Sequence, residues 1–96
     1  MPDRKLYIKR MKAKLDIRKA ELDKLRAQAR YANADVRLKV PKEIESLEQR
    51  VGEIRQRLAE ISETTGEAWD TIRKGADTSW EMLKTGIREV QSRFRK

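Results

Sequence analysis

Apolar side chains recur along the first two thirds of this chain at alternating steps of three and four residues. Such steps place them on one face of an α-helix, in the heptad pattern of a coiled coil. The pattern predicts an all-α protein made of long helices with narrow apolar seams. The seam residues expected to pack against other helices are Leu15, Leu22 and Leu25, followed by Ile44, Leu47, Val51, Ile54, Leu58 and Ile61.

The last third of the chain has a different repeat, because Trp69 and Trp80 are eleven residues apart and so are Gly75 and Gly86. Eleven residues make about three helical turns, so the repeated side chains return to one helix face. Each glycine costs about 1 kcal/mol relative to alanine in a helix, which close helix–helix packing would offset. We therefore expect this face to lie in a helical core. Its residues are Trp69, Ile72, Gly75, Ala76, Trp80, Leu83, Gly86, Ile87, Val90 and Phe94.

Two places in the sequence suggest helix boundaries. Pro41 lacks a backbone donor and disfavours helical geometry at the residue before it. No Gly, Asn, Ser or Asp lies in residues 36–40 to close a turn, so we favour one long helix kinked at Pro41. A break at Pro41, with a new helix starting there, is the alternative. Thr64 and Glu67 match the capping box, so a reversal is expected near 63–66.

These boundaries predict a long helical hairpin, or antiparallel coiled coil, with helices at about 3–40, 41–62 and 67–94. The chain then forms a single domain over residues 1–96, with a basic heptad part (1–40), an acidic heptad part (41–63) and a tryptophan-bearing part (64–96). If the helix continues through Pro41, the first segment lacks a partner for its seam. A homo-oligomer, most simply an antiparallel dimer, would cover that seam. If Pro41 is instead a hairpin turn, a monomeric three-helix bundle becomes feasible.

Composition narrows the classes of function. Of the 96 residues 42% are charged, and the chain has neither cysteine nor histidine. Without cysteine it forms no disulfide or thiolate metal site, and without histidine it lacks the commonest general base and metal ligand. We expect no enzyme activity, no catalytic, metal or cofactor site, and no small-molecule substrate. No apolar run reaches the ~20 residues that a membrane span needs. A cytoplasmic protein of bacterial type is expected, with a membrane-peripheral location as the alternative.

The positive charge is uneven. Residues 1–40 contain thirteen Lys and Arg against five Asp and Glu, which equals the net charge of +8 for the whole chain. Such a segment either pairs with acidic neighbours or attracts phosphates of nucleic acid or anionic lipid. The candidate anion contacts are Arg4, Lys5, Lys9, Arg10, Lys12 and Lys14.

Several runs resemble a family of small bacterial coiled-coil proteins of about this length, some of them labelled stress-response proteins. The runs are Tyr7–Asp16, Glu21–Leu25, Gly66–Gly75, Ser79–Lys84 and Ser92–Phe94. The resemblance implies a helical, non-enzymatic protein and supplies no ligand or site residues. Pro41 departs from the uninterrupted helix of the family.

The expected function is that of a helical structural or interaction protein, which associates with itself through its seams. One alternative is peripheral binding to anionic membranes through the amphipathic C-terminal helix. A second is non-specific nucleic-acid binding through the basic N-terminal helix.

Overall fold

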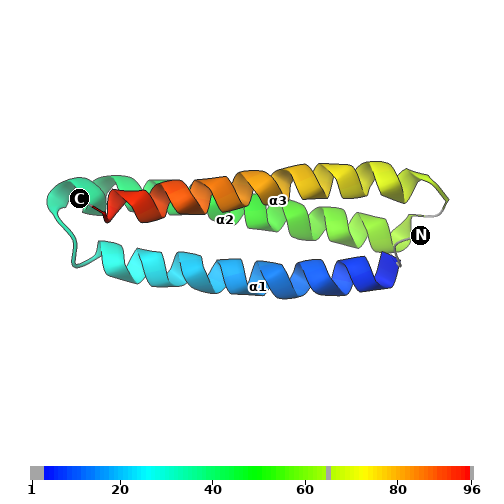
Figure 1. The fold of residues 1–96 in the computed structure, drawn as a ribbon, viewed down its shortest axis with the longest axis horizontal. Helices are drawn as coiled ribbons and strands as arrows, with labels where there is room; N and C mark the ends of the chain where they lie inside the picture. The colour runs from blue at the N-terminus through cyan, green and yellow to red at the C-terminus, as the bar shows by residue number, and fades with distance from the viewer. Residues whose placement is uncertain (1–3, 65, 96) are drawn as a thin grey trace.

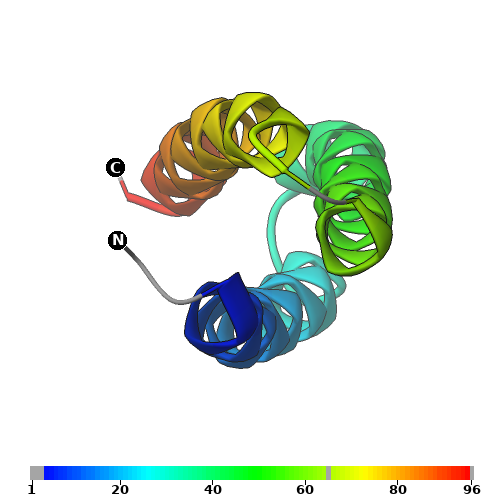
Figure 2. The ribbon, with the colours of Figure 1, turned by 90° about the vertical axis from the view of Figure 1, so that its right-hand side faces the viewer.

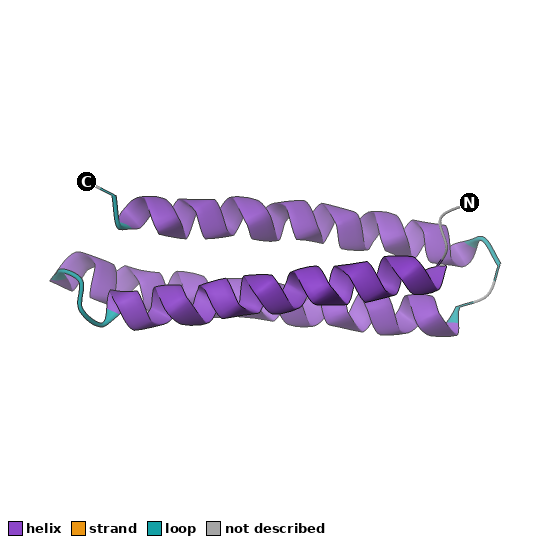
Figure 3. Ribbon diagram, turned by 60° about the horizontal axis from the view of Figure 1, so that its bottom comes forward, coloured by secondary structure: helices purple, strands orange, loops and turns teal. Residues whose placement is uncertain are grey.

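Three long α-helices make up the fold in the computed structural model, which describes residues 4–64 and 66–95. They are α1 (Arg4–Ala29), α2 (Ala34–Glu63) and α3 (Ala68–Arg93), and no strand occurs among the described residues (Figures 1 and 3). The molecule is a rod with extents of 51 × 19 × 18 Å. The predicted all-α class is therefore confirmed.

The middle helix joins the other two. Both α1 and α3 pack along α2, whereas contact between α1 and α3 is sparse. The end-on view in Figure 2 shows α1 and α3 on different sides of α2, spread apart where they face each other. Since α1 and α3 both run opposite to α2, they run parallel to each other (Figure 1).

The first helix ends earlier than the heptad pattern predicts. It stops at Ala29, and the chain reverses over residues 30–33. Asn33 is the N-cap of α2, and its side-chain oxygen accepts a hydrogen bond from the Val36 amide at 3.0 Å. An asparagine oxygen in this position satisfies one of the free amides at the start of a helix.

Both expectations about Pro41 are therefore wrong. Neither one continuous helix over 3–62 nor a helix boundary at Pro41 occurs, because α2 starts at Ala34 and continues through the proline. The proline removes one backbone hydrogen bond, which packing along the rest of α2 offsets. Asn33, the residue that caps α2, lies three residues before the 36–40 segment, which contains no turn residue.

The second reversal, predicted near 63–66, is confirmed between Glu63 and Ala68. Gly66 has a φ of 72°, a left-handed conformation that glycine adopts without strain. The predicted capping box is wrong, however. The Thr64 hydroxyl donates to the Glu60 carbonyl at 2.6 Å and closes α2, while Glu67 forms no side-chain cap of α3. Thr65, the other threonine of the motif, lies outside the described residues.

One continuous core runs the length of the rod, formed by side chains from all three helices. The stripe on α2 is buried from one end to the other and faces both neighbouring helices. It consists of Val36, Val40, Ile44, Leu47, Val51, Ile54, Leu58 and Ile61. Each fully buried aliphatic side chain contributes about 1.5–3 kcal/mol relative to an exposed one. The core therefore depends mainly on one helix that serves two partners.

The glycines of α3 lie where its backbone comes close to α2. A methyl group added at Gly86 would overlap the Leu47 Cδ2 methyl, and one at Gly75 would lie 2.8 Å from Arg57 Nη1. Gly52 on α2, by contrast, has nothing within 4 Å of such a methyl group. The three helical glycines thus differ in their surroundings although they share a helical backbone.

Gly86→Ala and Gly52→Ala form a matched pair for testing this close approach. Both gain up to about 1 kcal/mol of helix propensity, so Gly52→Ala should raise the free energy of unfolding. The free energy of unfolding of Gly86→Ala should be about 1–3 kcal/mol lower than that of Gly52→Ala, because the new methyl group overpacks the site beside Leu47. Urea unfolding followed by circular dichroism measures both. Equal stabilisation would show that α2 and α3 do not pack closely here.

Candidate interaction surface

The residues predicted to pack between helices are found in the interior, although not all are fully buried. The buried ones are Leu15, Leu22, Leu25, Ile44, Leu47, Val51, Ile54, Leu58, Ile61, Ala76, Trp80, Leu83, Ile87 and Val90. Trp69, Ile72 and Phe94 are partly buried against the same core, and Gly75 and Gly86 are half-buried. The apolar face of α3 therefore lies against protein and is not presented to a membrane in this arrangement.

At the N-terminal end of α1, a polar contact joins α1 to α3. The Tyr7 hydroxyl donates to Asp77 at 2.7 Å, and Arg73 holds both Asp77 and Asp70 in ion pairs. Burial and the bond to Asp77 raise the pKa of Tyr7 well above its usual value. The hydrogen bond to Arg73 lowers the pKa of Asp70. Both shifts move these pKa values away from neutral, so Tyr7 stays protonated and Asp70 stays ionised at neutral pH.

Beyond Tyr7, direct contact between α1 and α3 is sparse, and the described residues form two hollows along this pair of helices. One, of about 230 Å³, is lined by Lys14, Ile17 and Arg18 of α1 and by Trp80 and Lys84 of α3. We call it the Trp80 hollow. The second, of about 430 Å³, lies farther along the same pair of helices. Its lining residues are Glu21, Lys24, Leu25, Gln28, Gln91, Phe94 and Arg95.

Positive charge gathers around the indole of Trp80. The ring centre lies 5.8 Å from Lys14 Nζ and 5.4 Å from Arg18 Cζ, and the residue is 8% exposed. Both cations are within the ~6 Å range of a cation–π interaction. Sequence reasoning did not bring Arg18 and Lys84 together with Lys14. Their approach to Lys14 depends on how α1 and α3 are aligned, which no local pattern reveals.

The predicted anion contacts do not form one patch. Arg4 donates to the Thr64 carbonyl at the end of α2. The other five are exposed, and at 100° per residue they fall on two sides of α1. Lys12 lines a hollow between α1 and α2 together with Asp16 and Arg55, whereas Lys14 lines the Trp80 hollow on the other side. Lys5 and Lys9 fall on the side of Lys12, and Arg10 falls on the side of Lys14.

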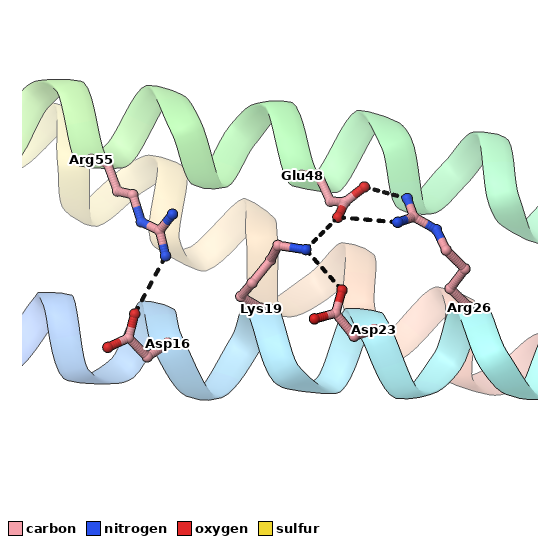
Figure 4. A network of polar contacts seen from close by, with 6 residues as sticks. All are labelled: Asp16, Lys19, Asp23, Arg26, Glu48 and Arg55. Carbon is pink, nitrogen blue, oxygen red and sulfur yellow. Dashed lines mark hydrogen bonds and ion pairs between the residues drawn. The ribbon is translucent and has the colours of Figure 1, made fainter.

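Ion pairs fix the alignment of α1 on α2 (Figure 4). Glu48 of α2 binds Lys19 at 2.7 Å and pairs with Arg26, both from α1, while Arg55 pairs with Asp16 at 3.3 Å. The Lys19 hydrogen bond, aided by Arg26, lowers the pKa of Glu48. In the sequence Glu48 resembles any other glutamate, because its partners are 22 and 29 residues away.

Searches against family models, curated proteins and solved structures returned no match to this chain. The resemblance to small bacterial coiled-coil proteins therefore stays a prediction. None of the helices, over the residues described, is both long and apolar enough to cross a membrane. Residues 4–64 and 66–95 contain no group of three or more Asp or Glu side chains placed to hold a metal ion.

The ion pairs of Glu48 with Lys19 and Arg26 predict a specific pH dependence of stability. The folded pKa of Glu48 is lowered, so its contribution is complete above the unfolded pKa of about 4.3 and is lost as pH falls through the folded value. Glu48→Gln should lower the free energy of unfolding by about 1 kcal/mol at pH 7, and this difference from the wild type should vanish at pH 3. Urea titrations at a series of pH values measure the difference.

Glu45→Gln is the control for this experiment. Glu45 is exposed on α2 and has no ion-pair partner among the described residues. Its substitution should leave the unfolding curves close to those of the wild type across the pH range. If the stability of Glu45→Gln and that of Glu48→Gln depend on pH in the same way, the ion pairs of Glu48 with α1 do not stabilise the fold.

Proposed function

We propose that this protein is a non-enzymatic helical interaction protein that associates with itself by exchanging α1 between two copies. The turn over residues 30–33 would act as the hinge. The observation that carries the proposal is a heptad seam that runs through this turn without interruption. In a dimer of this kind, α1 of each copy packs on α2 of its partner. Exchange of an identical element is a low-cost route to dimers.

The seam supports the exchange because it fits both connections between α1 and α2. Leu25, Ala29, Ala32, Val36 and Val40 follow one another at steps of three or four residues. In one continuous helix they would share one face, so the seam of α1 would extend directly into that of α2. The same residues therefore suit either a reversal or an extended helix that pairs with a second copy.

To become helical, the backbone of the turn must change mainly at the ψ angle of Asn33. No residue of the turn has a positive φ, and Asn33 has a φ of −65°, which is already a helical value. Its ψ of 167° is far from the helical value of about −42°. The amides of Arg30, Tyr31 and Ala32 bond to carbonyls three residues back, as in a tightened helical turn. The turn contains no glycine or proline to oppose continuation of the helix.

The charges favour exchange over pairing of two complete surfaces. Two copies that met through the open side between α1 and α3 would bring Lys14, Arg18 and Lys84 of each against the same cations of the other. Like charges in contact oppose association. Exchange of α1 instead re-forms the attractive ion pairs of Glu48 and Arg55 between copies.

The cap of α2 sets the balance between the single-chain bundle and the exchanged dimer. Asn33→Ala removes the cap, which costs the hairpin about 1 kcal/mol per turn, and alanine favours the continuous helix. Two turns are lost per dimer, so the association constant should rise by about thirtyfold. Light scattering after size-exclusion chromatography over a range of protein concentrations measures the mass.

Asn33→Asp is the matched control, because aspartate caps a helix as well as asparagine does. It should keep the mass distribution of the wild type. The proposal fails if Asn33→Ala remains a monomer at every concentration, or if both variants shift the mass equally. In the second case, a general effect on the turn would account for the change without any role for the cap.

A further inference from the structure

The Trp80 hollow combines features that, taken together, suit a particular ligand. We propose that it binds a phosphate group carried by an apolar or aromatic moiety, with Lys14, Arg18 and Lys84 holding the phosphate and Trp80 and Ile17 contacting the apolar part. The ligand is held and not transformed. The hollow is formed by α1 and α3 beside α2, so the inference does not depend on exchange between copies.

The first step is the charge. Lys14 and Arg18 stand one helical turn apart on α1 and face the same indole, and Lys84 approaches from α3. Like charges four residues apart on a helix destabilise it. Arg18 pairs with Glu21 and Lys84 with Glu81, but Lys14 has no ion-pair partner among the described residues. An anion between the two helices would relieve this repulsion and give Lys14 a partner.

The second step is the number of acceptor atoms. Three cations line the hollow from two helices. A phosphate group offers three acceptor oxygens and up to two negative charges to them, whereas a carboxylate offers two oxygens and one charge. The guanidinium of Arg18 can bond two phosphate oxygens at once, and the lysines act as point charges. The arrangement therefore favours phosphate over carboxylate.

The third step is the apolar wall. Ile17 lies in the hollow beside Trp80 and is 60% exposed, although it is a large aliphatic residue. The hollow of about 230 Å³ is larger than a phosphate group requires. A share of liquid volume of about 30 Å³ per water molecule means that several waters fill it when no ligand is bound. A ring or short alkyl group would displace them from Ile17 and the indole edge.

The same chemistry occurs in soluble phosphate esters and in lipid headgroups, and the experiment must separate the two. Trp69→Phe leaves Trp80 as the single tryptophan, so emission reports on the hollow alone. The probes are phenyl phosphate, benzyl alcohol as its neutral counterpart, and vesicles of phosphatidylcholine with or without phosphatidic acid. Phenyl phosphate should change the emission saturably, because the anion moves Lys14 and Arg18 relative to the ring, and benzyl alcohol should not.

Matched variants in the Trp69→Phe background test the residues. Lys14→Gln and Lys84→Gln should each weaken phenyl phosphate binding by about tenfold, the value of one charge-assisted hydrogen bond. Lys39→Gln is the control, since Lys39 is an exposed lysine of α2 that pairs only with Asp35. Its effect should stay within about twofold. Equal weakening by all three variants would reveal a non-specific charge effect and overturn the site.

The vesicles identify the source of the phosphate. A response to phosphatidic acid vesicles but not to phenyl phosphate, lost in Lys14→Gln, would support the site with a lipid headgroup as its ligand. A response to phenyl phosphate alone would support it with a soluble ester. If neither probe changes Trp80 emission while circular dichroism shows an intact helical fold, the proposal is wrong.

Discussion

The fold depends on a single apolar stripe along α2, which must cover the apolar faces of both α1 and α3. Every residue of that stripe from Val36 to Ile61 is buried, and α1 and α3 gain most of their cover from it. A chain with 42% charged residues has too few apolar side chains to close a third interface of equal density. The side between α1 and α3 is therefore more open than the other two, and it is bridged by Tyr7 and by the cations over Trp80.

That open side explains where the charged residues gather. Cations on helices that pack tightly are held apart, or are paired with acids as at Glu48 (Figure 4). Lys14, Arg18 and Lys84 lie along the sparse boundary between α1 and α3, where Arg18 and Lys84 pair only with acids of their own helices, among the described residues. Trp80 is large enough to fill part of this space and to receive cations over its ring. The hollow therefore follows from packing two helices against one.

The turn at residues 30–33 separates α1 from α2 at a point where the spacing of apolar residues continues. Asn33 forms one side-chain hydrogen bond that starts α2, worth about 1 kcal/mol. The heptad seam would be satisfied equally by a straight helix, which is why periodicity alone predicts no interruption there. The cap at Asn33 and the packing of both helices therefore decide a connection that apolar spacing alone leaves open.

The sequence by itself determined the all-α class and the faces that are buried, because helical periodicity is a local property. It also located the reversal near 63–66, but from a capping box that does not form; the structure turns there with Gly66 in a left-handed conformation. Even the close approach at Gly86 was signalled by a glycine that a surface helix would not need. Only the tertiary structure decided that Asn33 starts α2, that Glu48 binds Lys19 and Arg26, and that Lys84 meets Lys14 beside Trp80. Such pairings depend on the alignment of helices far apart in the chain, and side-chain spacing along a single helix carries no information about that alignment.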